Sequence, residues 1–120
     1  CDFRFMRSDK GYICFPEVDM NIPFVPGLID VILKAIPKYK FNDMILTGRK
    51  LGASEMAEAN FIDRTFESVD SLDEGALEFA KTFSKSRAIF AEHKRRLHKP
   101  VLDALAEKNP PVIEAMKILL

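Results

Sequence analysis

The strongest constraint on what this chain can fold into is a change in the spacing of its apolar residues. Near the start, Cys1, Phe3 and Phe5 alternate with polar residues, which predicts a half-buried strand. In the last third of the chain the apolar residues instead recur at steps of three and four, which predicts amphipathic helices. We therefore expect an α/β chain with a mixed region over residues 1–66 and a helical region over residues 67–120.

The mixed region contains several short elements separated by turns and prolines. A second apolar segment at residues 12–15 predicts another strand, which Pro16 ends, and Phe61 with Ile62 predicts a brief buried strand. Because two short strands alone do not form a stable sheet, we expect that their neighbours in the sheet are missing from this chain or come from elsewhere. Apolar spacing and flanking Gly or Pro predict short helices over residues 28–36, 41–46 and 54–59.

The helical region carries signals for where its helices begin. Ser71 and Glu74 have the Ser-x-x-Glu spacing of a capping box, so the first helix is expected to begin at Ser71. A second helix is expected from about Arg87, with a kink or a restart at Pro100. Pro110 is expected to open an apolar final helix.

Composition and charge narrow the classes of function that the chain can have. Its 18 basic residues balance 18 acidic residues, so no overall field attracts nucleic acid or an anionic membrane. No apolar stretch approaches the roughly 20 residues of a membrane span. Cys1 and Cys14 have neither a metal-ligand spacing nor the pattern of a disulfide framework, so we expect reduced thiols, no metal site and a cytoplasmic location.

Glu17 is the first candidate for a chemical role. It follows an apolar segment and Pro16, and it precedes the proline-rich loop of residues 21–27. An apolar wall disfavours the charged form of a carboxylate, which suits a group that takes up and returns a proton. Two structural alternatives stand beside this role: a solvated loop glutamate, or an ion pair with Arg4 or Arg7.

The second candidate is a basic run in the last third of the chain. On a helix, Arg95 and Lys99 share a face, and so do Lys94 and His98. Such a run is typical of a solvated helix face, and it also suits contacts to phosphate groups. Nucleic-acid binding is a poorer match at zero net charge. The run consists of Arg87, His93, Lys94, Arg95, Arg96, His98 and Lys99.

Several sequence segments occur in the order and at the spacing of a known family. They are Cys1-Asp2, Phe15-Pro16-Glu17-Val18, Pro26-Gly27, the stretch from Leu46 to Glu55, and Phe61-Ile62-Asp63. In these segments the chain resembles the crotonase family of enoyl-CoA hydratases and isomerases, and the stretch after Glu17 is closest to Δ3,Δ2-enoyl-CoA isomerase-like members. Asn60 stands where glycine is usual, and asparagine tolerates left-handed backbone conformations. Asn21 and Leu28-Ile29 also replace glycines of the family.

The resemblance implies the C-terminal half of a crotonase-like (ClpP/crotonase) α/β fold and an enzyme of fatty-acyl-CoA metabolism. By this resemblance, Glu17 is the acid/base that moves protons at an acyl-CoA thioester. The backbone amides that stabilise the enolate, and the second glutamate that hydratases use, would precede residue 1, so we expect this chain to be an incomplete enzyme. The resemblance also implies an acyl pocket shaped by Ile22, Phe24, Pro26 and Gly27, with the nucleotide end of coenzyme A near Lys94, Arg95 or Lys99.

The resemblance further implies how the chain is organised and assembled. Residues 1–66 would form the C-terminal part of the crotonase core, and residues 67–120 the helical region that serves oligomerisation and the coenzyme A side. Family members assemble as trimers or pairs of trimers, and they need no metal or redox cofactor because coenzyme A is part of the substrate. Two alternatives remain: a non-catalytic crotonase-like binding or assembly module in which Glu17 is incidental, and a basic-helix protein that binds nucleic acid.

Overall fold

The computed structural model describes residues 1–119, which form two compact units. The first unit comprises residues 1–22 and 35–84, and the second comprises residues 23–34 and those from 85 onward. Residue 120, the last of the expected helical region, lies outside the described residues. Among the described residues, no helix combines the length and the apolar character that crossing a membrane requires.

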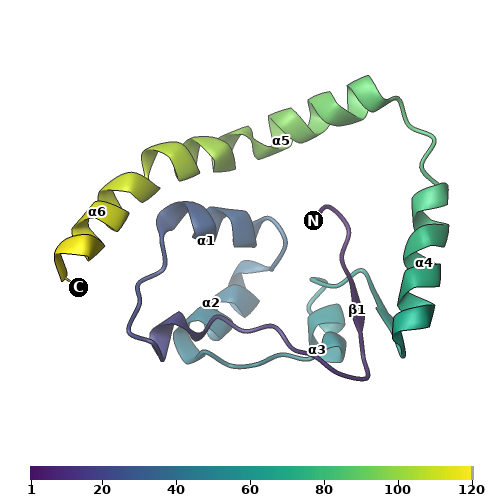
Figure 1. Ribbon diagram of the computed structural model, residues 1–120, viewed down its shortest axis with the longest axis horizontal. Helices are drawn as coiled ribbons and strands as arrows, with labels where there is room; N and C mark the ends of the chain where they lie inside the picture. The colour runs from purple at the N-terminus through teal and green to yellow at the C-terminus, as the bar shows by residue number, and fades with distance from the viewer. Residues whose placement is uncertain (120) are drawn as a thin grey trace. The chain divides into compact units, whose positions relative to one another are not determined.

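The first unit mixes strands and helices, whereas the described part of the second is built from helices (Figure 1). The first unit contains β1 (Phe5–Arg7), the 3-10 helix η1 (Pro16–Val18), α2 (Lys38–Thr47), α3 (Ala53–Glu58), β2 (Arg64–Phe66) and α4 (Val69–Lys81). The second unit contains α1 (Pro26–Leu33), α5 (Arg87–Glu107) and α6 (Asn109–Leu119). The expected α/β class is confirmed.

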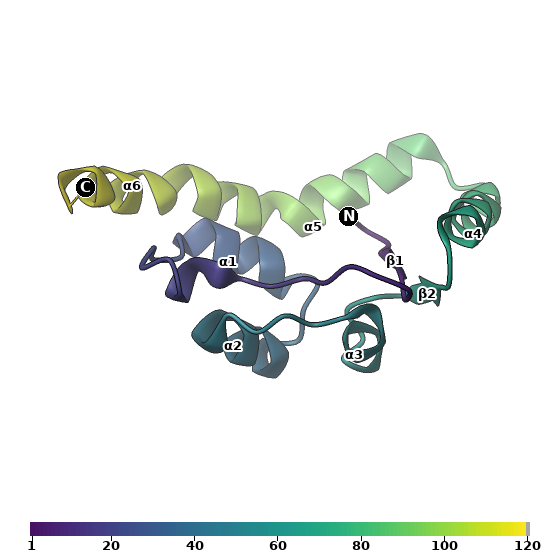
Figure 2. The ribbon, with the colours of Figure 1, turned by 60° about the horizontal axis from the view of Figure 1, so that its bottom comes forward.

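The two short strands lie side by side and run in parallel (Figure 2). Phe5 pairs with Arg64, and Arg7 pairs with Phe66. The strand expected from the alternation near the N-terminus therefore begins at Phe5. One partner of β1 lies in the same chain, and among the described residues β1 and β2 form a two-stranded sheet.

The other two strand predictions are wrong. Residues 12–15 form only one bridge, in which Ile13 and Leu51 exchange two backbone hydrogen bonds of 2.9 Å, because the chain turns into η1 directly afterwards. Residues 61–62 form no strand, because both of their amides donate to the carbonyl of Met56. These amides complete the end of α3 and so are not available to a sheet.

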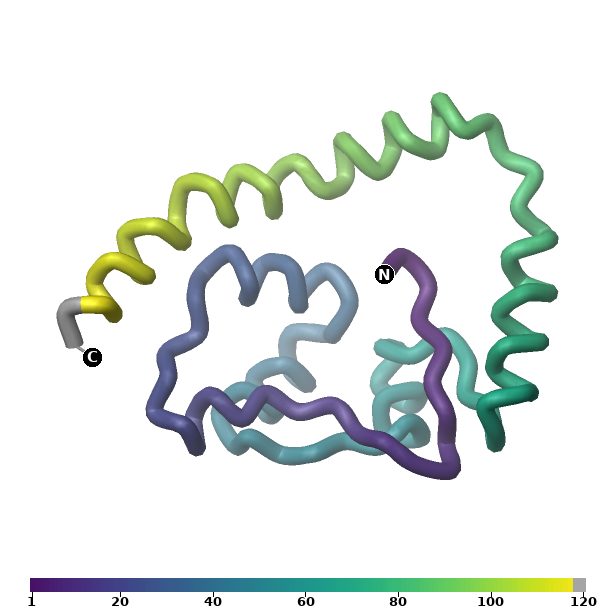
Figure 3. Tube along the Cα trace, in the orientation of Figure 1, coloured from purple at the N-terminus to yellow at the C-terminus, as the bar shows by residue number. Residues whose placement is uncertain are grey.

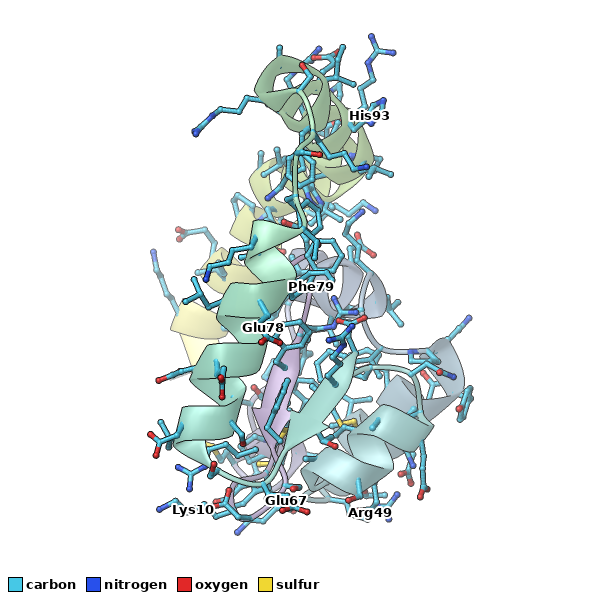
Figure 4. The ribbon with its side chains drawn as sticks, turned by 90° about the vertical axis from the view of Figure 1, so that its right-hand side faces the viewer. Lys10, Arg49, Glu67, Glu78, Phe79 and His93 are labelled. Atoms are coloured by element: carbon cyan, nitrogen blue, oxygen red, sulfur yellow. The ribbon has the colours of Figure 1, made fainter. Side chains whose placement is uncertain are left out.

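The helix α4 covers the strands through a cluster of aromatic rings. The Phe79 ring meets the rings of Phe3 and Phe5 edge-on, with centroids 4.8 and 5.3 Å apart, and Figure 4 shows Phe79 on the side of α4 that faces the strands. Gly75 allows this close approach, because a side chain there would collide with the ring of Phe66. This packing places α4 in the first unit, together with the two strands.

The start of α4 corrects the expected capping box. The side chain of Ser68 accepts a hydrogen bond from the Ser71 amide at 3.2 Å, and the Ser71 hydroxyl accepts one from the Ser68 amide at 3.1 Å. The box therefore joins Ser68 to Ser71 and not Ser71 to Glu74. Ser68 has the extended backbone that an N-cap residue needs, whereas Ser71 already lies within the helix.

The helices α2 and α3 confirm the expected helices over residues 41–46 and 54–59, with α2 beginning three residues earlier, at Lys38. The apolar residues of each helix recur on one face, and this face contributes buried side chains to the core of the first unit. The buried apolar side chains of the first unit are Ile36, Phe41, Met44, Leu51, Ala53, Met56, Ala59 and Ile62.

In the second unit α1 packs along α5 (Figures 1 and 2). The ammonium of Lys34, at the end of α1, donates to the carbonyl of Leu97 at 2.7 Å. Leu97 lies three residues before Pro100 in the sequence. Pro100 has no backbone N–H and so removes one hydrogen bond from the helix, yet α5 continues through it to Glu107 without a restart. Figure 3 shows the chain passing directly from α5 into α6, whose start at Asn109 is close to the one expected.

Candidate active site

The candidate base Glu17 lies on η1, which packs against α2. Pro16 is the first residue of η1, and its ring fixes φ. Proline has no backbone N–H, which costs nothing at this position because the N–H of a first helical residue has no acceptor within the helix. Immediately before it, the ring of Phe15 meets the ring of Phe41 edge-on, with centroids 5.5 Å apart. Because Phe41 is buried, this contact anchors the segment that carries Glu17 on the core of the first unit.

A closed turn follows Glu17 and fixes the backbone around it. The amide of Asp19 donates to the carbonyl of Pro16 at 3.0 Å. The amide of Ile22 donates to the carbonyl of Glu17, also at 3.0 Å, and Asn21 between them has a left-handed backbone with φ 56°. The turn therefore links two of the predicted site residues, Glu17 and Ile22, directly through the backbone.

One oxygen of the Glu17 carboxylate is buried away from solvent. This atom, Oε2, has no hydrogen-bond partner among the described residues. The expected alternative partners are engaged elsewhere: Arg4 pairs with Asp63 at 3.8 Å, and Arg7 donates from Nε to Asp9 at 2.8 Å, which lowers the pKa of the Asp9 carboxyl. Since buried polar atoms are usually hydrogen-bonded, this oxygen is suited to accept a proton from a bound molecule.

Gly48 supports the turn that carries Glu17, although the sequence assigns it no part in the site. It ends α2 with a left-handed backbone of φ 65°, and its amide donates to the carbonyl of Met44 at 2.9 Å. A side chain at Gly48 would collide with the carboxylate of Asp19, two residues after Glu17. The Thr-Gly pair at positions 47 and 48 signals a helix end, but nothing local in the sequence shows this contact with η1.

Three of the predicted acyl-pocket residues belong to the second unit. Phe24 and Pro26 are half-buried there, and Gly27 is buried. The amide of Gly27 donates to Oδ1 of Asn109 at 2.7 Å, and a Cβ atom on Gly27 would lie 2.9 Å from the Cα atom of Leu105. Gly27 is therefore a packing residue between α1 and the α5–α6 segment. The sequence marks Asn109 only as the residue before a pair of prolines, so its contact with Gly27 could not be predicted.

The predicted coenzyme A contacts Lys94, Arg95 and Lys99 all lie on α5. Arg95 donates from Nε to Glu92 at 2.9 Å, and the ammonium of Lys99 lies 2.8 Å from a carboxylate oxygen of Asp103. The hydrogen bond from Arg95 is the chief cause that lowers the pKa of Glu92. Two of the three predicted cations are thus partly neutralised by acids of their own helix, and Lys94 is half-buried.

Other side chains of possible chemical use are spread over the molecule. An open hollow of about 440 Å³ on α5 is lined by His93, Arg96 and Leu97. Cys1 is exposed and Cys14 is half-buried, and both are free thiols. Within residues 1–119, no three His, Cys, Asp or Glu side chains are grouped closely enough to hold a metal ion. The Oε2 atom of Glu17, which is buried without a hydrogen-bond partner among the described residues, is therefore the strongest candidate for a chemical role.

Comparison with solved structures identifies the fold. An enoyl-CoA hydratase/isomerase family protein from Pseudomonas syringae matches with a TM-score of 0.79 and 21% sequence identity, over 90% of this chain and 47% of its own. An enoyl-CoA hydratase from Geobacillus kaustophilus HTA426 matches with a TM-score of 0.56 and 27% identity, over 68% of this chain and 31% of its own. The fold is crotonase-like.

This crotonase-like fold is the one expected from the motifs around Glu17. The chain spans about half the length of the first of these proteins and less than a third of the second. No protein-family model matches the chain, and no curated protein matches it in sequence. The similarity therefore establishes the fold, whereas a role for Glu17 depends on the geometry of the turn.

Proposed function

We propose that this chain is part of an enoyl-CoA hydratase/isomerase of fatty-acyl-CoA metabolism in which Glu17 is the acid/base. The observation that carries the proposal is the buried Oε2 atom of Glu17, which has no hydrogen-bond partner among residues 1–119 and lies on a turn anchored to the core. The crotonase-like fold supports it, because the two solved structures named above are described as an enoyl-CoA hydratase/isomerase family protein and an enoyl-CoA hydratase. We favour isomerisation over hydration, on the sequence around Glu17.

One carboxylate can carry out the whole proton shift. The Glu17 carboxylate removes a proton from the carbon between the thioester and the β,γ double bond, and the electron pair moves onto the thioester oxygen as an enolate. Protonated Glu17 then returns the proton to the γ-carbon, the enolate collapses, and an α,β-unsaturated thioester results. The enolate oxygen requires preorganised backbone amides, which we place in residues outside this sequence.

The remaining predicted residues would bind the substrate. Ile22 follows Glu17 in the same turn and is 46% exposed, so its side chain is free to contact an acyl tail. We assign Phe24, Pro26 and Gly27 to the same acyl pocket. The nucleotide end of coenzyme A is assigned to Lys94, Arg95 and Lys99, because ammonium and guanidinium groups recognise phosphates.

The proposed chemistry also defines the setting of the enzyme. The proton shift needs neither a metal nor a redox group, and coenzyme A enters as part of the substrate. We place the enzyme in the cytoplasm and expect trimers or hexamers in the complete protein. Nucleic acid is not among its proposed partners.

The test is the substitution Glu17→Gln in the complete protein, assayed with a 3-enoyl-CoA for isomerisation and a 2-enoyl-CoA for hydration. Glutamine keeps the shape of the side chain but cannot take up the proton, so kcat should fall by about 10²–10⁴-fold while acyl-CoA binding is retained. Glu58→Gln is the matched control, because Glu58 is an exposed glutamate on α3, and it should leave kcat unchanged.

The outcomes distinguish the proposal from its main alternative. Near-normal turnover by Glu17→Gln would contradict the acid/base role. If the unaltered complete protein binds an acyl-CoA but turns over neither substrate, the chain is better described as a non-catalytic crotonase-like binding or assembly module.

A further inference from the structure

Asn21 adopts a backbone conformation that few residues other than glycine adopt. Its φ is 56°, in the left-handed region, where a β-branched side chain is strongly disfavoured. Asn21 is the first residue of the proline-rich loop of residues 21–27, which follows the 3-10 helix that carries Glu17. Its side chain is exposed and forms no hydrogen bond with the described residues, so the backbone conformation is what Asn21 contributes.

The left-handed conformation closes the turn directly onto Glu17. It directs the amide of Ile22 back to the carbonyl of Glu17, at 3.0 Å, which is the six-residue hydrogen bond that accompanies a left-handed residue at the end of a helix. The same Glu17 carbonyl accepts from the amide of Met20 at 3.2 Å. If Asn21 adopted a negative φ, the Ile22 amide would turn away and the first of these bonds would be lost.

The backbone has to hold Glu17 in place, because its side chain is not held by hydrogen bonds at the buried end. The Oε2 atom has no hydrogen-bond partner among residues 1–119. We propose that Asn21 is a positioning residue whose left-handed backbone fixes where the Glu17 carboxylate lies. This inference rests on the proposed function, in which Glu17 moves the proton.

The chain contains a matched control for the same backbone conformation. Asn60 has φ 58° at the end of α3, and the Phe61 amide there donates to the Met56 carbonyl across it at 2.9 Å. Both positions therefore pair a left-handed asparagine with the same six-residue hydrogen bond. Asn60 differs in that its turn does not carry the proposed base.

The experiment compares Asn21→Val with Asn60→Val in the complete protein, using isomerisation of a 3-enoyl-CoA and thermal unfolding as readouts. Both variants should lower Tm to a similar extent, because valine is strained at either site. Only Asn21→Val should lower kcat, by about 10²-fold, with a smaller change in KM, because misplacement of a reacting group affects the chemical step. Asn21→Gly should restore kcat, because glycine adopts the left-handed conformation freely.

The other possible results distinguish a failure of the positioning role of Asn21 from a failure of the acid/base role of Glu17. Equal losses of kcat in Asn21→Val and Asn60→Val, or no loss in Asn21→Val, would overturn the positioning role. If Asn21→Val does not fold, Asn21→Ala replaces it with a smaller strain, and the comparison is then made with Asn60→Ala. If Glu17→Gln retains turnover, it is the proposed function that fails, whereas loss of turnover in Glu17→Gln with normal kcat in Asn21→Val rejects only the role of Asn21.

Discussion

At the scale of single residues, Gly27 shows how little room the packing of α1 leaves. An added Cβ atom would lie 2.9 Å from both the Cα and the Cδ2 atoms of Leu105 and 2.8 Å from Oδ1 of Asn109. The Cα atom belongs to the α5 backbone and cannot rotate away, so the helices would have to separate. The hydrogen bond from the Gly27 amide to Asn109 would be strained at the same time.

We therefore expect Gly27→Ala to lower the free energy of unfolding by about 1–3 kcal/mol, as overpacking does, although alanine is the better helix former. Urea unfolding followed by circular dichroism measures this change. Gly52→Ala is the control, because a Cβ atom at Gly52 meets nothing within 4 Å, and its effect should stay below about 1 kcal/mol. Equal losses in the two variants would contradict the steric argument.

The backbone conformation of a single residue can be predicted from its type more readily than the burial of its side chain. Asn60 could be expected in this conformation from its residue type, and φ 58° confirms it. The burial of the Glu17 oxygen could not be predicted in the same way, because the 3-10 helix that carries Glu17 packs against α2, which is distant in sequence. Residue type limits the local backbone, whereas the surroundings of a side chain depend on contacts that only the fold creates.

At the scale of elements, two serines at helix starts differ in a way that can be measured. Ser68 accepts a hydrogen bond from the Ser71 amide at the start of α4, whereas Ser86 at the start of α5 makes no capping hydrogen bond with its side chain. Ser68→Ala should therefore lower the free energy of unfolding by about 1 kcal/mol. Ser86→Ala should change it by less than about 0.5 kcal/mol.

Thermal or urea unfolding of both variants checks this difference. If Ser68→Ala proves neutral, or if Ser86→Ala is the more damaging, the cap of α4 has been assigned to the wrong residue. A further variant, Glu74→Ala, separates the two assignments of the capping box, because Glu74 has no capping role when Ser68 and Ser71 form the box.

The elements that could be predicted from the sequence are those with a strong local signal. The helices α2 and α3 have apolar spacing and glycine or proline at their ends, so their existence and approximate bounds were expected. The strands have only three residues each, and β2 lies just beyond the segment expected to be extended. Strand pairing depends on which segments meet in space, and the amides of residues 61–62 were already used by the end of α3.

At the scale of the whole molecule, we propose that the chain supplies the acid/base Glu17 but not every part of the proposed site. It spans 47% of the length of the first matched protein, and we place the amides that stabilise the enolate in residues outside this sequence. The division into a unit with Glu17 and a unit with α5 could not be predicted from the sequence, because residues 23–34 follow directly on residues 1–22 and join the unit of α5 only through contacts that the fold creates. The fold itself was predictable from a few short motifs, since they recur at fixed spacing.

The 120-residue chain on its own therefore offers the last test. We expect it to show no isomerisation of a 3-enoyl-CoA above the rate in buffer, because a proton acceptor without oxyanion donors leaves the enolate unstabilised, and loss of one such donor alone costs about 10²–10³-fold in kcat. Circular dichroism and urea unfolding establish that the chain is folded in the assay, and the complete protein serves as the positive control. Turnover by the isolated chain at the rate of the complete protein would show that its own backbone supplies those donors, and the proposed division of the site would then be wrong.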